Sequence, residues 1–183
     1  MTVTTYKWTI DRYHQAIRAG LFNEQPLELI SGELIVMPPE GEIHAYYNSE
    51  VGDYLRSLLG NRAKVREAHP IILNNNSEPI PDLAIVKPLG RIYLEHHPYP
   101  EDIFWIIEFS NTTLTQDLTT KKQLYAASGI PEYWVVNLQE NQLHVYTDPK
   151  NGDYATETIL TAGVRSAVAF NDVEIQVQRL IRT

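Results

Sequence analysis

Two apolar runs in the middle of this 183-residue chain each adjoin or contain one carboxylate. Residues 83–86 read Leu-Ala-Ile-Val directly after Asp82, and residues 103–109 read Ile-Phe-Trp-Ile-Ile-Glu-Phe, in which the acidic residue is Glu108. Short apolar runs of this kind are typical of buried β-strands. A carboxylate in such a strand costs free energy unless it is ion-paired, hydrogen-bonded or bound to a metal ion. The sequence therefore predicts a buried sheet that carries a pair of functional carboxylates.

The composition is that of an ordinary globular protein. Hydrophobic residues make up 43% and charged residues 21%, and we expect one domain, 1–183, with a substantial core. The absence of cysteine excludes a disulfide framework, a thiol nucleophile and thiolate metal ligands. The N-terminal residues lack an apolar signal segment and no run is long enough to cross a bilayer. We therefore expect a soluble, cytoplasmic protein with no membrane partner.

The formal net charge of -8 argues against a general nucleic-acid coat protein, which is usually basic. A nuclease is compatible with this charge, because bound cations offset a carboxylate-rich site. Screening over about 10 Å also lets a local basic surface act independently of the total charge. Six basic residues either form such a surface or are scattered solvated charges: Lys64, Arg66, Lys87, Arg91, Lys121 and Lys122.

Periodicity and turn residues predict an alternation of helices and strands. Helices are expected at 9–19, 43–59 and 117–128, where apolar side chains recur at helical spacing and a glycine follows. A two-residue hairpin is expected between strands at 27–30 and 33–37. Further strands are expected at 63–66, 70–73, 82–86, 103–109, 132–137, 142–147 and 156–160. This order predicts an α/β fold with a central mixed β-sheet flanked by helices.

Lys121 is predicted to complete the site from the third helix. Lys121 and Tyr125 are four residues apart and share one helix face, and Asp117 precedes Lys121 by the same favourable spacing. Neighbouring helical residues are rotated by about 100°, so Lys122 is expected to point away from the carboxylates. Two carboxylates and a lysine are the minimal set for metal-assisted hydrolysis of a phosphodiester bond.

Several segments with their own signatures follow one another in a fixed order. They are 81–86 (Pro-Asp-Leu-Ala-Ile-Val), 107–113 (Ile-Glu-Phe-Ser-Asn-Thr-Thr), Asp117-x-x-x-Lys121-x-x-x-Tyr125, 127–136, and upstream 27–34 with Met37-Pro38-Pro39 and His44. Together they resemble the Uma-type putative restriction endonuclease family, a branch of the PD-(D/E)XK nuclease superfamily. The resemblance covers nearly the whole chain and implies a restriction-endonuclease-like fold.

The resemblance also implies a metal-dependent endonuclease that hydrolyses DNA. Asp82 and Glu108 would bind Mg²⁺ or Mn²⁺, and Lys121 would assist the attacking water. In the superfamily the lysine normally lies two residues after the glutamate, where this chain has Ser110. The lysine is therefore expected to have moved to the next helix. Cleavage of two DNA strands favours two sites related by symmetry, so we also expect a homodimer.

Each candidate residue has a simpler structural explanation. Asp82 is suited to capping a turn at the strand entrance. Glu108 is suited to a buried ion pair with Lys121 that only stabilises the fold. Asp117 is expected to be the N-cap of the third helix rather than a catalytic group, and Tyr125 is expected to be a core residue.

Two further residues leave their roles open. Glu28, in the hairpin, is either an additional carboxylate of the metal site or an exposed strand residue. His44 is expected to be a polar residue at a helix start.

The alternative function is a non-catalytic oligomeric interaction module that retains the nuclease fold. Metal binding by Asp82 and Glu108 distinguishes the two functions.

Overall fold

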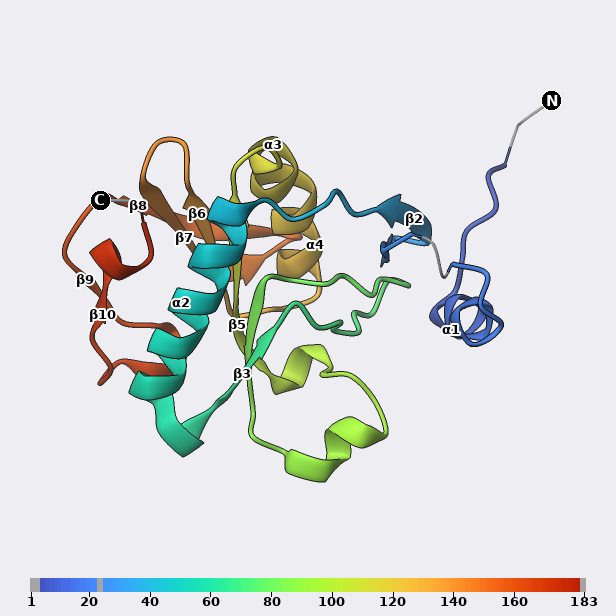
Figure 1. Cartoon of the computed structure of the whole chain (residues 1–183), viewed down its shortest axis with the longest axis horizontal. Coiled ribbons are helices and arrows are strands. Elements are labelled where there is room, and N and C mark those ends of the chain that lie inside the picture. Colours follow the sequence, from blue (N-terminus) through green and yellow to red (C-terminus); the bar gives the residue numbers. More distant parts are fainter. Residues whose placement is uncertain (1–3, 23–24, 182–183) are drawn as a thin grey trace.

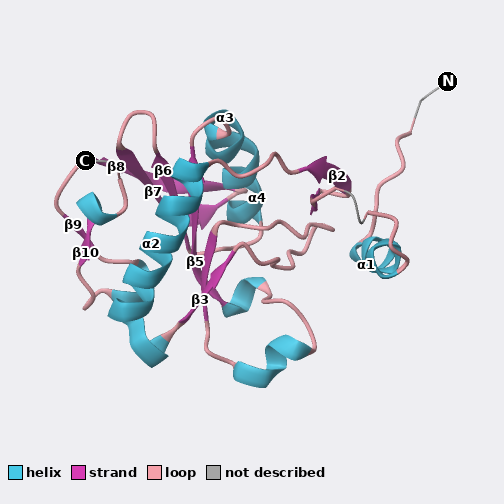
Figure 2. Ribbon diagram, in the orientation of Figure 1, coloured by secondary structure: helices cyan, strands magenta, loops and turns pink. Residues whose placement is uncertain are grey.

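A six-stranded mixed sheet forms the centre of the computed structural model, which describes residues 4–22 and 25–181. Its strands, in the order in which they pair, are β3 (Lys64–Glu67), β4 (Leu83–Val86), β5 (Ile103–Ser110), β6 (Glu132–Asn137), β7 (Gln142–Lys150) and β8 (Asp153–Leu160). All neighbours are antiparallel except β5 and β6, which are parallel. Helices lie against this sheet (Figures 1 and 2), which confirms the predicted α/β fold class.

The N-terminal elements lie at one end of the molecule. Helix α1 (Ile10–Arg18) begins after Thr9, whose hydroxyl accepts a hydrogen bond from the Arg12 backbone N–H at 3.3 Å. The hairpin of β1 (Leu27–Ile30) and β2 (Glu33–Val36) follows, and both elements lie to the right of the sheet in Figure 1. The chain then enters the long helix α2 (Glu42–Leu59), which crosses the sheet.

The parallel pair β5–β6 requires a crossover connection, and a helical segment supplies it. This segment consists of α3 (Leu114–Gln116), the π-helical turn η4 (Asp117–Lys121) and α4 (Lys122–Ala127). The segment begins at Leu114, so Asp117 lies inside it. The prediction that Asp117 is the N-cap is therefore wrong.

The two faces of the sheet pack against different elements. Val51 of α2 lies in one apolar cluster with Trp105 and Trp134. On the other face, Tyr125 of α4 lies in a cluster with Ile106. The C-terminal elements join the α2 face. They are β10 (Ile175–Gln176) and the 3₁₀ turns η5 (Val168–Phe170) and η6 (Val177–Arg179), and β9 (Val164–Arg165) pairs with β10.

The strand predicted at 70–73 is absent as a sheet strand. This segment makes only an isolated bridge, between Leu73 and Ser77. Its backbone N–H groups bond instead to loop carbonyls, with Ile71 donating to Pro79 at 3.1 Å and Ile72 to Pro98 at 2.9 Å. The remaining short elements are the 3₁₀ turns η1 (Gly60–Arg62), η2 (Gly90–Leu94) and η3 (Pro100–Asp102). None of the helices in the described residues has the length and apolar character needed to cross a membrane.

The register of β4 and β5 determines where the carboxylates lie. Leu83 pairs with Ile107, so Asp82, which directly precedes β4, lies beside Glu108. Side chains alternate along a strand, so Glu108 faces the same side as Ile106, which is the side covered by α4. The fold therefore places one carboxylate directly before β4 and the other beside it on β5.

Candidate active site

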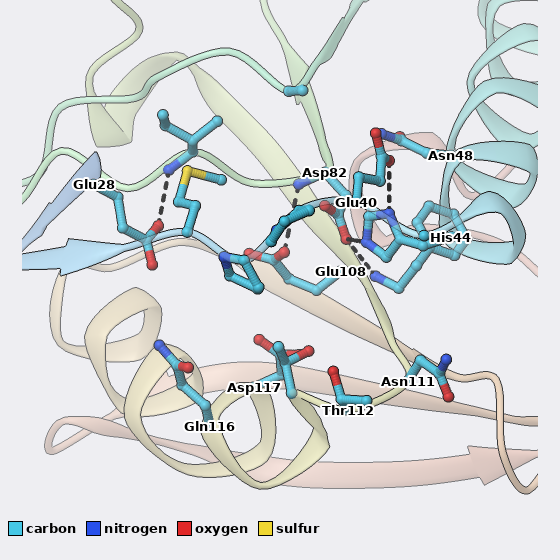
Figure 3. Close-up of a pocket in the computed structure, with 18 of the residues that line it drawn as sticks. Glu28, Glu40, His44, Asn48, Asp82, Glu108, Asn111, Thr112, Gln116 and Asp117 are labelled. Atoms are coloured by element: carbon cyan, nitrogen blue, oxygen red, sulfur yellow. Dashed lines mark hydrogen bonds and ion pairs between the residues drawn. The ribbon is translucent and has the colours of Figure 1, made fainter. Parts of the chain in front are cut away.

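A cavity of 410 Å³ opens at the end of the sheet where the chain enters β4 and leaves β5. Figure 3 shows Asp82 and Glu108 in its middle, with Glu28 to one side, His44 of α2 to the other, and Asp117 opposite. Three parts of the chain that are far apart in sequence thus meet around the carboxylate pair.

Asp82 is held through one of its two oxygens. Its Oδ2 atom accepts the Phe109 backbone N–H at 2.6 Å and lies 2.9 Å from His44 Nε2. No hydrogen bond from the described residues reaches Oδ1. The side chain is 17% exposed. Oδ1 is therefore the oxygen that a ligand in the cavity can use.

Glu108 repeats this arrangement in a more buried position. Its Oε1 atom accepts hydrogen bonds from Lys121 Nζ at 3.0 Å and from the Tyr125 hydroxyl at 2.8 Å. Among the described residues, the one contact to Oε2 is the Asp82 backbone N–H, at a long 3.4 Å. Each carboxylate therefore uses one oxygen for two protein donors and leaves the other without a strong protein partner.

The two neighbouring lysines point in different directions, as expected. Lys121 lies 3.0 Å from Glu108 and 3.8 Å from Asp117 Oδ1. Lys122 pairs instead with Asp153 on β8, at 3.0 Å. Tyr125 is a core residue, as predicted, and its hydroxyl also reaches the site. The structure thus brings together Asp82, Glu108 and Lys121, whose chemical roles remain predictions.

Burial and mutual attraction set the charges of the Glu108–Lys121 pair. Burial raises the pKa of Glu108 well above its ordinary value, and the Lys121 ammonium opposes that rise. Burial by itself lowers the pKa of Lys121, but the surrounding carboxylates, first of all Glu108, outweigh burial and raise it. Burial and then Glu108 raise the pKa of Tyr125. Lys121 therefore stays a cation and Tyr125 stays a hydrogen-bond donor.

Asp117 connects the end of β5 to the helical crossover. Its Oδ2 atom accepts hydrogen bonds from the hydroxyls of Ser110 and Thr113, each at 2.7 Å. Ser110 occupies the strand position that the resemblance assigns to lysine. Through its hydrogen bond to Asp117, the Ser110 hydroxyl anchors the helical segment from which Lys121 reaches the same cavity.

Glu28 lies in the wall of the cavity, so of the two alternatives for this residue the exposed strand residue is wrong. The residue is 3% exposed and lies in the cavity wall. Its Oε2 atom accepts the Ile80 backbone N–H at 3.2 Å. The segment before β4 covers this strand, which the alternating pattern of a short hairpin does not reveal.

His44 lies in the first turn of α2, as expected, but its contact with Asp82 was not predicted. Its two ring nitrogens lie 2.9 Å from Asp82 Oδ2 and 2.7 Å from Glu40 Oε1, so both carry a proton. Burial lowers the pKa of His44, but the hydrogen bonds to Asp82 and Glu40 outweigh burial and raise the pKa to about 9. The spacing of four between Glu40 and His44 signals the first contact. No local pattern signals the contact with Asp82.

The donor set suits a hydrated, oxygen-preferring cation. Among residues 4–22 and 25–181, no three His, Asp or Glu side chains form a cluster that encloses a metal ion. Zinc usually takes three or four protein ligands. Mg²⁺ keeps several waters and is commonly held by one or two carboxylates. One available oxygen from Asp82 and one from Glu108 fit the second pattern.

A mixed sheet with one parallel pair, a helical crossover and adjacent carboxylates at the strand ends is the arrangement of restriction-endonuclease-like folds. The chain belongs to the Uma2 family, described as putative restriction endonucleases, whose family model matches residues 10–178. The fold is similar to a crystal structure of a putative nuclease belonging to DUF820 from Anabaena variabilis ATCC 29413. The TM-score is 0.70 at 16% identity, over 86% of this chain and 90% of that chain. Comparison with curated proteins gave no match. The family and the fold support a nuclease role.

Proposed function

We propose that this protein is a metal-dependent DNA endonuclease whose active site contains Asp82, Glu108 and Lys121. The observation that carries the proposal is the hydrogen-bond pattern of the two carboxylates. In each, one oxygen contacts two protein donors, and the other oxygen has no strong protein partner and is available to a ligand in the cavity. Glu132, a buried carboxylate outside the cavity, differs. Its Oε1 accepts from Trp134 and Arg165, and its Oε2 accepts the Val168 backbone N–H. Glu132 thus uses both of its oxygens for protein donors.

Each residue of the site has a distinct part in the proposed reaction. Asp82 and Glu108 would hold Mg²⁺ or Mn²⁺, each through the oxygen that lacks a strong protein partner. The bound ion would polarise the scissile phosphate and lower the pKa of the attacking water. Lys121 keeps one N–H on Glu108 and directs another at the water or at the charge that develops on the phosphate. Glu28 and Asp117 add negative charge to the wall around the cation.

Cleavage of supercoiled plasmid DNA tests this proposal. Wild type is expected to nick or linearise the plasmid with Mg²⁺ or Mn²⁺, and to leave it intact when the metal is chelated. Asp82→Asn keeps an oxygen for the Phe109 N–H but removes the charge. This variant is expected to lose cleavage while its circular dichroism spectrum is unchanged.

Lys122→Met serves as the matched control, because Lys122 pairs with Asp153 away from the carboxylates. This variant is expected to cleave like wild type. A folded wild type that leaves double- and single-stranded DNA intact with either metal contradicts the endonuclease proposal. Such a result would favour a non-catalytic interaction module.

We also propose that the active protein is a homodimer. One carboxylate site contacts one DNA strand, and two-fold symmetry supplies a second site for the other strand. Multi-angle light scattering is expected to give about twice the 21.0 kDa mass of the chain. A single-chain mass at every working concentration rules out this assembly without affecting the site assignment.

A further inference from the structure

His44 connects helix α2 to the carboxylate pair through Asp82 (Figure 3). Resting on the proposed function, we infer that His44 is a positioning residue of the metal site. It fixes the Asp82 carboxylate so that Oδ1 faces the cavity, and Glu40 in turn fixes His44. The side chains form a series, Glu40–His44–Asp82, that runs from the exposed rim of the cavity to the start of β4.

The imidazole of His44 is restrained on three sides. Nδ1 lies 2.7 Å from Glu40 Oε1, and Nε2 lies 2.9 Å from Asp82 Oδ2. The ring also packs edge-on against Phe109, with ring centroids 6.1 Å apart at 84°. The helix behind it is anchored in the core through Val51. His44 is therefore a rigid point from which a carboxylate can be oriented.

Asp82 needs such a second donor. The Phe109 N–H approaches Oδ2 from β5, and His44 approaches the same oxygen from α2. One donor alone leaves the carboxylate free to rotate about its last bond, whereas two donors from different elements define its plane. Glu108 is restrained in the same way by Lys121 and Tyr125. His44 thus does for Asp82 what those two residues do for Glu108.

A purely electrostatic role for His44 predicts the opposite effect on metal affinity. A cation beside Asp82 repels a metal ion, so its removal would tighten metal binding. A positioning residue does the reverse, because its removal disorders the ligand that the ion needs. Loss of an interaction that orients a metal ligand typically weakens metal binding by about 10–100-fold. The direction of the change therefore separates the two roles.

The test is titration of the full chain with Mn²⁺ alone, followed by electron paramagnetic resonance of the free ion. We expect His44→Ala to weaken Mn²⁺ binding by about 10–100-fold. His44→Gln, whose amide N–H can still donate to Asp82, is expected to recover at least part of this loss. His14→Ala is the matched control: His14 is 29% exposed against 24% for His44 and is also paired with a carboxylate, Glu78, outside the cavity. Its Mn²⁺ affinity is expected to equal that of wild type.

The outcomes separate this inference from the proposed function. If wild type binds Mn²⁺ and His44→Ala binds it equally or more tightly, the positioning role is overturned while the nuclease proposal stands. A His44→Gln variant as weak as His44→Ala, with both folded in thermal melts, also overturns it. If wild type binds no Mn²⁺, the proposed function and this inference fall together.

Discussion

Replacing Lys121 with methionine is expected to lower the free energy of unfolding by about 3–5 kcal/mol. The Lys121 and Glu108 side chains are 11% and 3% exposed, so water compensates only in part for the loss of either partner of their ion pair. Lys121→Met leaves Oε1 of Glu108 with the Tyr125 hydroxyl as its remaining donor. Urea denaturation, followed by the fluorescence of the buried Trp105 and Trp134, measures the change.

Two further variants show whether the loss comes from an unpaired buried charge. Lys122→Met removes a lysine whose partner, Asp153, is 48% exposed, and is expected to cost no more than about 1 kcal/mol. Adding Glu108→Gln to Lys121→Met removes both buried charges and is expected to recover part of the lost stability. A loss below about 1 kcal/mol for Lys121→Met would show that the pair is effectively solvated.

Mg²⁺ or Mn²⁺ is expected to stabilise wild type, and Asp82→Asn is expected to abolish this response. An ion at a hundred times its dissociation constant raises the free energy of unfolding by about 2.7 kcal/mol when it binds only the native state. Asp82→Asn removes a ligand charge but leaves the buried Glu108–Lys121 pair intact. Thermal melts with and without metal give the comparison, with the metal-free variant expected to stay folded.

Asp82 is a better choice than Glu108 for this experiment. Glu108→Gln would also remove the main partner of the buried Lys121, so a loss of metal response and a loss of fold would be confused. Asp172→Asn controls for charge alone, because Asp172 pairs with Arg62 on the surface. If neither metal changes the melting temperature of wild type, the proposal of a metal-dependent nuclease loses its support.

Local sequence patterns predicted the parts of the site that depend on strand and helix periodicity. The apolar runs around Asp82 and Glu108 predicted two buried strands, and the pairing of β4 and β5 places the carboxylates side by side. Helical spacing distinguished Lys121 from Lys122, because Lys121 and Tyr125 both reach Glu108 although Lys121 ends the π-helical turn η4. In each case the information lies within about one turn or one strand of the residue concerned.

Contacts that depend on tertiary packing were not accessible from these patterns. His44 meets Asp82 only because the N-terminal turn of α2 packs over the start of β4. Glu28 is buried only because the segment at Ile80 covers the hairpin. Residues 70–73 have the composition of a strand but bond to loop carbonyls instead. Asp117 is a residue type that often caps helices, yet its carboxylate instead accepts hydrogen bonds from the hydroxyl groups of Ser110 and Thr113.

Because of the π-helical turn η4, the geometry of the site depends on the number of residues in this turn more than on the identity of the exposed side chains of the turn. A π-helical turn contains one residue more than the α-helical turn it replaces. Thr119 and Thr120 are exposed within it, so other side chains can take their places. Deleting either residue would remove the extra residue of the π turn and change the alignment of Asp117 with Lys121. Insertions and deletions in this turn should therefore be far rarer among functional variants of the chain than substitutions.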